Sequence, residues 1–169
     1  MADIIGERFG VALPATFVSD YRAALKEAFA DSLQTTPGFL DVLGQLTCAA
    51  CVATSSSAPR VAHTLEAVGL TDHFGADVFT ASQVANGKPA PDLFLFAARE
   101  MSTLPERCLV IEDSAAGIEA GLAAGMNVWR YVGASHIADT ARARDETPAG
   151  VTVFDNWDRF YVLAPELKA

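Results

Sequence analysis

The chain has 169 residues, 51% of them hydrophobic, and is long enough to bury one substantial core. Its formal net charge of −9 and its pI near 4.6 argue against the basic surface that binds nucleic acids or anionic membranes. Charged residues interrupt the N-terminal apolar residues, and no run of about 18 apolar residues occurs, so neither a signal peptide nor a membrane span is predicted. We expect a cytoplasmic protein that binds a metal ion or a small metabolite.

Two helices are predicted before the first break in the pattern. Residues 2–10 form a short helical segment, and residues 15–33 carry apolar side chains at helical spacing. This apolar stripe consists of Phe17, Tyr21, Ala24, Leu25, Ala28 and Phe29. The sequence TTPGF at 35–39 then marks a Pro/Gly break between substructures.

Beyond this break, short apolar runs alternate with helical segments. Strands are predicted at 47–54, 77–81, 108–112, 127–132 and 151–154, and helices at about 59–68, 92–101 and 115–124. This alternation is typical of βαβ units, so the predicted fold class is α/β, with a doubly wound parallel sheet covered by helices on both faces. The charged residues 138–147 are expected to form a solvated helix or loop.

Cys48 and Cys51 form a C-x-x-C pair of the kind that can bind zinc or undergo redox chemistry. On a buried strand, however, residues three apart point to opposite faces, so these thiols would not meet. We therefore expect Cys48, Cys51 and Cys108 to be packed structural thiols. The three histidines share no metal-ligand spacing and are expected to be ordinary surface or partly buried residues.

Glu112 and Asp113 stand at the carboxyl end of the predicted strand 108–112, which is the edge where parallel sheets bind ligands. Two ionised carboxylates at a dry strand end repel each other unless a cation offsets their charge. Mg²⁺ prefers oxygen ligands and needs only one or two protein carboxylates. The alternative, that Asp113 or Ser114 only caps the following helix, stays open on these residues alone.

Glycines recur every four residues in the helix that follows, at Gly117, Gly121 and Gly125. This spacing predicts a helix face that approaches the sheet closely. Gly125 is also expected to be the left-handed residue that ends the helix.

Two other segments carry polar groups to the same edge. Residues 54–57 place four hydroxyls between a strand and a helix, where they either bind phosphate or cap the helix. Lys88 lies in a loop stiffened by Pro89 and Pro91, where it either pairs with an anion or is solvated. Together, the hydroxyls, the lysine and the carboxylates are the groups that a phosphate and its neutralising metal ion require.

Three stretches carry a family resemblance: VATSSS at 52–57, GKPAPDLFLFAA at 87–98 and LVIEDSAAGIEAGLAAGM at 109–126. Their order and spacing resemble the haloacid dehalogenase-like hydrolase superfamily, in the branch with β-phosphoglucomutase and phosphatases of small metabolites. The resemblance spans about residues 37–154 and implies a Rossmann-like core. It also implies that Ser55 and Lys88 are catalytic, that Ser55, Ser56 and Lys88 bind phosphate, and that Asp113 binds Mg²⁺ with Glu112 beside it.

Members of this superfamily open with a strand ending in D-x-D, which provides the nucleophile and the general acid/base, and no D-x-D occurs in these 169 residues. The resemblance implies that residues 1–35 are a partial α-helical cap and that residues 36–169 are a core without its first strand. That strand would lie between those ending at Ser55 and at Asp113, so its absence leaves two edges unpaired. A truncated chain, complementation by a separate segment or a second copy, and a pseudoenzyme are the three explanations.

The resemblance thus implies a Mg²⁺-dependent phosphohydrolase or phosphomutase that acts through an aspartyl-phosphate on a small phosphorylated metabolite, such as a sugar phosphate. The alternative is a non-catalytic pseudoenzyme or a signalling module such as a receiver domain, although a receiver's acid pair precedes its lysine. A true haloacid dehalogenase needs no metal, and the acidic residues at 111–114 argue against this activity.

Two further questions are left open by the sequence. Residues 133–136 either face the crevice or form a plain loop, and the chain is either a monomer or a homodimer.

Overall fold

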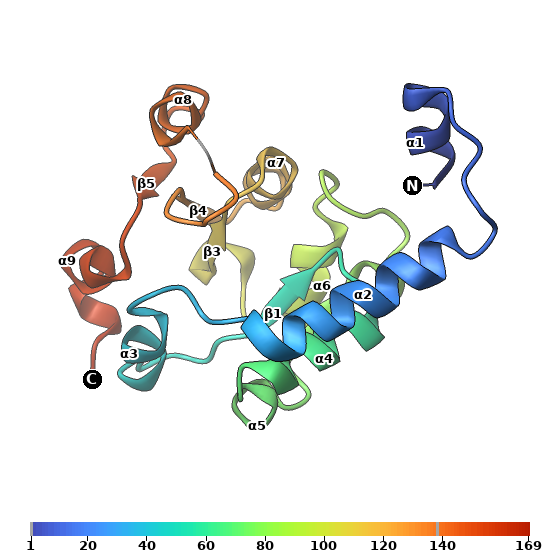
Figure 1. Ribbon diagram of the computed structural model, residues 1–169. Coiled ribbons are helices and arrows are strands. Elements are labelled where there is room, and N and C mark those ends of the chain that lie inside the picture. The colour runs from blue at the N-terminus through green and yellow to red at the C-terminus, as the bar shows by residue number, and fades with distance from the viewer. Residues whose placement is uncertain (1, 138) are drawn as a thin grey trace.

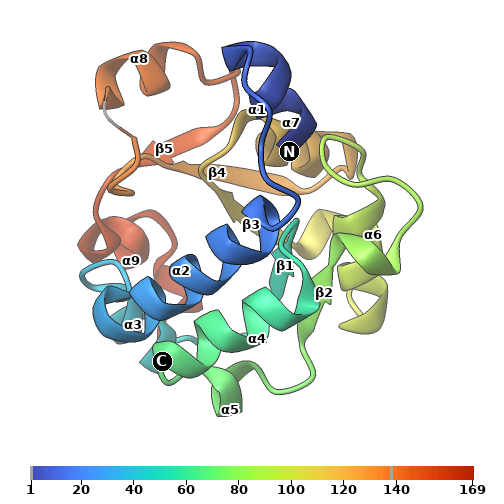
Figure 2. The same cartoon turned by 45° about the vertical axis from the view of Figure 1, so that its right-hand side comes forward.

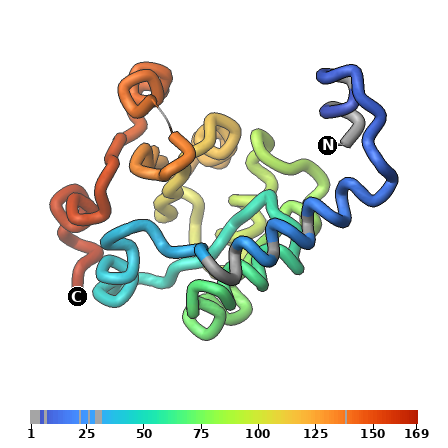
Figure 3. The backbone as a smooth tube through the Cα atoms, viewed as in Figure 1, coloured from blue at the N-terminus to red at the C-terminus, as the bar shows by residue number. Residues whose placement is uncertain are grey.

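Figure 1 shows the computed structural model of the chain, which describes residues 2–137 and 139–169. For residues 2–4, 7, 22, 26 and 29–31 it describes the backbone only. The predicted apolar stripe on residues 15–33 includes Phe29, whose side chain is therefore not described. Figure 3 traces the described residues as a coloured tube. No helix in this part of the chain is long and apolar enough to cross a membrane.

Strands and helices alternate from β1 onward, as predicted. The strands are β1 (Val52–Thr54), β2 (Val78–Thr80), β3 (Leu109–Glu112), β4 (Asn127–Tyr131) and β5 (Thr152–Phe154). The α-helices are α1 (Ala2–Phe9), α2 (Phe17–Ser32), α3 (Phe39–Gly44), α4 (Ala58–Ala67), α5 (Thr71–Phe74), α6 (Asp92–Glu100), α7 (Ala115–Ala123), α8 (Thr140–Asp145) and α9 (Phe160–Leu163). Short 3-10 helices are η1 (Ala81–Gln83), η2 (Pro105–Arg107), η3 (Trp157–Arg159) and η4 (Pro165–Leu167).

The prediction of a strand at 47–54 is wrong for residues 47–51, because β1 contains only Val52–Thr54. The Val52 N–H donates to the Asp77 carbonyl at 2.9 Å and begins the pairing with β2, whereas the Thr47 N–H donates to Leu167 near the C-terminus at 3.0 Å. Cys48 is therefore exposed, and the expectation of a packed thiol is wrong there. Cys51 and Cys108 do pack against the core. Burial, with a smaller contribution from Asp77, raises the pKa of Cys51 to about 11.

The parallel strands form two sheets instead of one continuous sheet. β1 pairs with β2, with Val52 opposite Val78, and the second sheet has the order β3-β4-β5. Within the described residues, no strand pairs with the second edge of β1 or of β3 (Figure 2). The sheet is thus split at the position where the resemblance places a further strand.

Helices cover both faces of the sheet formed by β1 and β2. Ala53 and Phe79 face α6, where Phe79 packs against Leu93 and Ala97. Val52 and Val78 point the opposite way, toward the apolar residues of α4 and α5. This alternation follows from the two-residue repeat of a strand. α2 runs alongside α4 in Figures 1 and 2 and leaves Tyr21 of its apolar stripe 45% exposed.

The second sheet is also covered on both faces. Val110 and Val128 face Ile118 and Ala120 of α7. The opposite face is covered by an aromatic cluster that includes Tyr131, Phe154, Trp157 and Phe160, with Leu109, Ile111 and Trp129 packed against it. The predicted doubly wound α/β architecture is therefore confirmed, because helices or helical segments cover both faces of each parallel sheet.

The glycines of α7 have different roles. A Cβ on Gly121 would lie 2.8 Å from Cγ2 of Val128, so this glycine permits the close approach to β4 that the spacing predicts. Gly125 does not face the sheet, because a Cβ there would meet nothing within 4 Å. Its φ of 71° and the hydrogen bond from the Met126 N–H to the Gly121 carbonyl identify it as the left-handed helix end.

The C-terminal segment holds α3, a helix that the sequence pattern did not predict. The Trp157 indole N–H donates to the Thr36 hydroxyl at 2.7 Å, and the Tyr161 hydroxyl donates to the Val42 carbonyl at 2.6 Å. The charged residues 139–147 are mostly exposed and include α8, so the prediction of a solvated helix or loop is confirmed for them. The buried Arg130 donates to the carbonyl of Ala143, the buried residue of α8, and fixes this helix to β4.

Candidate functional site

Lys88 projects from the loop between η1 and α6 toward the ends of β1 and β3. The loop is anchored by Asp92, whose carboxylate accepts from the backbone and side-chain N–H groups of Asn86 at 3.2 and 3.0 Å. The Lys88 ammonium donates to the Ala53 carbonyl at 3.1 Å and to the Glu112 carboxylate, and it lies 4.5 Å from the centre of the Phe94 ring. Its side chain is only 9% exposed, so Lys88 is not a solvated loop lysine.

The Glu112 carboxylate is 11% exposed and is surrounded by donors. One oxygen accepts from Lys88, and the other accepts from the Ser114 hydroxyl at 2.9 Å and from the Asp113 and Ser114 amides at 3.2 and 3.3 Å. Gly117 provides the room, because a Cβ there would lie 2.1 Å from the carboxylate carbon of Glu112. The ion pair and these hydrogen bonds offset the cost of burying the charge.

Asp113 is more open than its neighbour, with a side chain that is 40% exposed. Its carboxylate lies 3.2 Å from Nε2 of His136, which belongs to the loop after β4. Ser114 is the residue that caps α7, because its hydroxyl accepts from the Gly117 N–H at 3.1 Å. Of the two residues that could cap this helix, Ser114 therefore does so. The position of Asp113 at the strand end is not explained by capping.

The hydroxyl residues after β1 lie beyond the strand end whose Ala53 carbonyl accepts from Lys88. Ser55 is exposed, and the Ser56 N–H donates to the Thr54 hydroxyl at 3.1 Å. Ser57 occupies the N-cap position of α4 without a capping side-chain hydrogen bond. No hydrogen bond joins the Ser55 hydroxyl to Lys88 in the described part of the chain. The structure thus brings Lys88, Glu112 and Asp113 together and leaves Ser55 facing solvent.

Two residues of this site, Phe94 and Gly117, are not assigned to it by the sequence. Phe94 contacts the Lys88 ammonium, and nothing in the pattern distinguishes it from other core residues. Gly117 was interpreted as a packing residue for the sheet, whereas it makes room for Glu112. For residues 133–136, the contact of His136 with Asp113 favours the alternative that places this loop at the crevice.

The donor set fits a magnesium ion held mainly by water. Mg²⁺ keeps several waters and takes one or two carboxylates, and Asp113 is the more accessible of the two carboxylates at this strand end. Glu112 already accepts from Lys88 and Ser114, so its place as a metal ligand stays a prediction. Among the described residues there is no group of three or more His, Cys, Asp or Glu side chains that could hold a metal ion.

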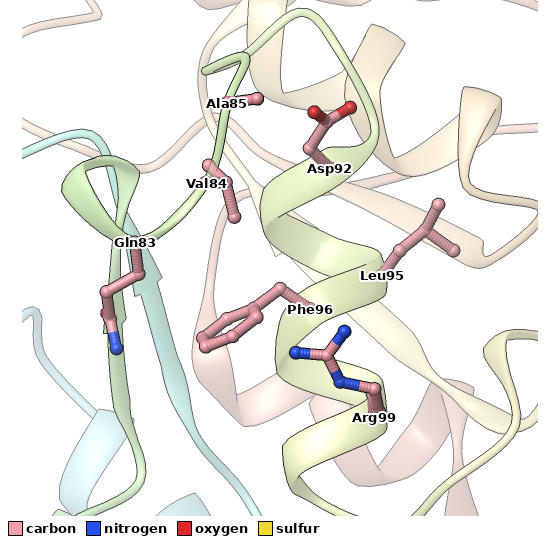
Figure 4. Close-up of a pocket in the computed structure, with 7 residues that line it drawn as sticks. All are labelled: Gln83, Val84, Ala85, Asp92, Leu95, Phe96 and Arg99. Atoms are coloured by element: carbon pink, nitrogen blue, oxygen red, sulfur yellow. The ribbon is translucent and has the colours of Figure 1, made fainter.

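A separate pocket of about 490 Å³ lies between α6 and the loop that follows η1 (Figure 4). Leu95, Phe96 and Arg99 line it from α6, and the Arg99 guanidinium lies 5.0 Å from the centre of the Phe96 ring. None of the predicted site residues lines this pocket, so it does not belong to the site around Lys88.

Comparisons with known proteins agree with this fold. Residues 7–125 match the haloacid dehalogenase-like hydrolase family. The chain is 28% identical over 135 residues to 6-phosphogluconate phosphatase from Escherichia coli, covering 79% of this chain and 61% of that protein. It is 32% identical over 120 residues to hexitol phosphatase A from the same organism, covering 68% and 52%.

The chain is also similar to a solved structure, that of a HAD family hydrolase from Deinococcus radiodurans with bound phosphate and sodium. The TM-score is 0.77 and the sequence identity 28%, over 98% of this chain and 74% of that chain. The chain spans less than two thirds of the length of either curated relative.

Proposed function

This chain belongs to the haloacid dehalogenase-like hydrolase family, and from that premise we propose that it binds the phosphate group of a small phosphorylated metabolite for hydrolysis. A sugar phosphate is the proposed substrate class. Its support is the similarity to the phosphatases of Escherichia coli named for 6-phosphogluconate and for hexitols. The hydrolase from Deinococcus radiodurans was solved with bound phosphate, which favours the binding of a phosphate group.

The observation that carries the proposal is the buried ammonium of Lys88 at the ends of two strands. The Ala53 carbonyl, the Phe94 ring and the Glu112 carboxylate fix this cation, so little further entropy is lost when it pairs with a phosphate oxygen. Ser55 is proposed to donate its hydroxyl to the transferred phosphoryl group, and Ser56 to bind the same group. Lys88 and Ser55 are therefore the proposed catalytic residues of this chain.

Asp113 is the proposed ligand of Mg²⁺, with Glu112 beside it. The Asp113 side chain is 40% exposed and does not cap α7, which favours a metal-binding role. The ion would neutralise negative charge on the phosphate oxygens. Glu112 also holds Lys88 in place, so it orients the proposed cation whether or not it contacts the metal.

Residues 1–35 are proposed to be part of a helical cap and residues 36–169 the core. The position of α2 alongside α4 supports a helical layer near the start of that core. The aspartate that would form an aspartyl-phosphate is proposed to come from outside this sequence, because no D-x-D occurs in it. A second candidate function is a non-catalytic module that binds phosphate and metal without turnover, a role for which the proposed ligands Ser55, Lys88 and Asp113 would suffice.

The decisive experiment is a calorimetric titration of inorganic phosphate into the 169-residue chain, with and without Mg²⁺. We expect Mg²⁺ to strengthen phosphate binding, because the ion reduces repulsion between phosphate and the carboxylates. Asp113→Asn should abolish this effect of Mg²⁺, and Ser55→Ala should weaken phosphate binding in both conditions. Asp145→Asn, which changes an exposed aspartate of α8, is the matched control. Phosphate binding that is absent, or unchanged by Asp113→Asn, would contradict the assignment.

A parallel assay separates the two candidate functions. Phosphate release from 6-phosphogluconate by wild-type chain, lost in Ser55→Ala, would support hydrolysis by these residues alone. Phosphate and Mg²⁺ binding without release would favour the non-catalytic module.

A further inference from the structure

His136 contacts Asp113, the proposed ligand of Mg²⁺, and has no part in the proposed function. Nε2 of His136 lies 3.2 Å from Oδ2 of Asp113, and the two side chains are 67% and 40% exposed. They come from two strand ends, because Asp113 follows β3 and His136 follows β4, and these neighbouring strands are parallel. An imidazole nitrogen and a carboxylate oxygen thus meet where a metal ion is proposed to bind.

The loop after β4 fixes the position of His136. Gly133 begins this loop, and a Cβ there would overlap the carbonyl oxygen of Asp155, so the chain passes close to the end of β5. Ala134 packs against the aromatic cluster, and its carbonyl accepts from the Ile137 N–H at 2.9 Å. This hydrogen bond closes a turn that contains His136. The imidazole therefore projects from a packed and hydrogen-bonded turn.

Glu112 is less available than His136 as a partner for Asp113. One oxygen of Glu112 accepts from Lys88, and the other accepts from the Ser114 hydroxyl and from two backbone amides. An ion at Asp113 would have to displace these donors to reach Glu112. It has to replace only one contact to reach Nε2 of His136.

The separation of Nε2 and Oδ2 fits two neighbouring ligands of one ion. Ligands about 2.1 Å from a metal ion lie about 3.0 Å apart in octahedral geometry and about 3.4 Å apart in tetrahedral geometry. The observed separation of 3.2 Å lies between these values. Both side chains are partly exposed, so they can rotate to direct their lone pairs at the same ion, and water can complete its coordination.

A nitrogen ligand changes which ion such a pair prefers. Mg²⁺ is a hard ion that takes oxygen ligands, whereas imidazole suits the divalent ions from iron to zinc. We infer that His136 is a second metal ligand beside Asp113 and shifts the preference of this site from Mg²⁺ toward divalent transition metals. The inference rests on the metal site of the proposed function and adds a protein ligand to it.

The test is a calorimetric titration of Co²⁺, and separately of Mg²⁺, into the 169-residue chain with Cys48→Ser as the reference. This substitution removes an exposed thiol that can itself bind Co²⁺. We expect Co²⁺ to bind the reference chain at least about tenfold more tightly than Mg²⁺. His136→Gln should weaken Co²⁺ binding at least about tenfold and change Mg²⁺ binding less than about twofold, because only Co²⁺ gains from the nitrogen.

Proton NMR of the Co²⁺-loaded reference chain reports the ligand directly. The ring protons of an imidazole bound to paramagnetic Co²⁺ shift far outside the usual range, and this measurement needs no variant at His136. We expect one such set of signals, absent in His136→Gln. His73→Gln, which removes an exposed histidine of α5, is the matched control and should retain both the signals and the Co²⁺ affinity.

The inference would be overturned by unchanged Co²⁺ binding in His136→Gln, by equal weakening of both ions, or by a spectrum without shifted imidazole protons. Absence of Co²⁺ binding would also overturn it. Asp113→Asn separates these failures from failure of the proposed function. If Asp113→Asn abolishes Mg²⁺ binding while His136→Gln changes neither ion, the proposed metal site stands and His136 is not a ligand. If Co²⁺ binding needs both residues and Mg²⁺ does not bind, the inference stands and the assignment of Mg²⁺ fails.

Discussion

The ammonium of Lys88 and the carboxylate of Glu112 form an ion pair that joins the two sheets, with side chains only 9% and 11% exposed. Breaking one side of such a pair leaves the other charge buried without its partner. We therefore expect Lys88→Met or Glu112→Gln to lower the free energy of unfolding by about 3 kcal/mol each. The double variant should be less destabilised than the sum of the two, because it leaves no unpaired charge. Urea unfolding of the four proteins measures this coupling.

The exposed Lys168 provides a control for loss of a lysine charge. Lys168→Met should leave the urea midpoint almost unchanged, because exposed charges contribute little to stability. Additive losses in the Lys88 and Glu112 variants would show that the two groups do not depend on each other.

Gly117→Ala should disturb the same ion pair from α7. The added Cβ would lie 2.1 Å from the carboxylate carbon of Glu112, so the carboxylate has to move away from Lys88 or α7 has to shift. We expect a loss of about 2 kcal/mol in the free energy of unfolding, which is typical of overpacking. Gly44→Ala, at a helical glycine with no atom within 4 Å of a new Cβ, is the matched control. Equal stability of the two variants would mean that Glu112 is not confined by Gly117.

The order of strands and helices in the core could be predicted because it depends on local apolar patterns, as at β3 and α7. The length of β1 could not, because it depends on where β2 stops pairing, and the apolar run continues back to Cys48. Likewise, Glu112 and Asp113 were recognisable as a pair at a strand end. Their separate surroundings, Lys88 for one and His136 for the other, depend on loops distant in sequence.

The three thiols should differ in reactivity because only Cys48 is exposed. Burial raises the pKa of Cys51 to about 11, so at pH 8 only about a thousandth of it is thiolate, the form that reacts with iodoacetamide. Mass spectrometry after timed labelling should therefore detect modification of Cys48 well before that of Cys51. Comparable rates at the two positions would contradict the burial of Cys51.

The same pKa shift makes stability depend on alkaline pH. The thiol of the unfolded chain ionises near its ordinary pKa of 9.0, whereas folded Cys51 keeps its proton up to a pKa of about 11. The unfolded state thus binds fewer protons than the folded state between these values, and stability falls as pH rises from 9 to 11. Below pH 9 this contribution is constant. Cys51→Ala should show a smaller loss of urea midpoint between pH 8.5 and 10.5 than wild type, and an identical loss would exclude Cys51 as the cause.

The hydrogen bond from the Trp157 indole to the Thr36 hydroxyl, 2.7 Å long, ties the start of the proposed core to the C-terminal segment. Trp157 is 7% exposed, so Thr36→Val leaves a buried donor unsatisfied and should cost about 1 to 3 kcal/mol of unfolding free energy. Thr36→Ser keeps the hydroxyl and should retain most of the stability. Hydrogen exchange of the Thr36→Val variant should increase in α3 and in residues 156–161, which pack together, while α7 keeps its wild-type rates. Faster exchange confined to α2 would instead indicate that Thr36 belongs with the N-terminal helices and would move the proposed boundary beyond it.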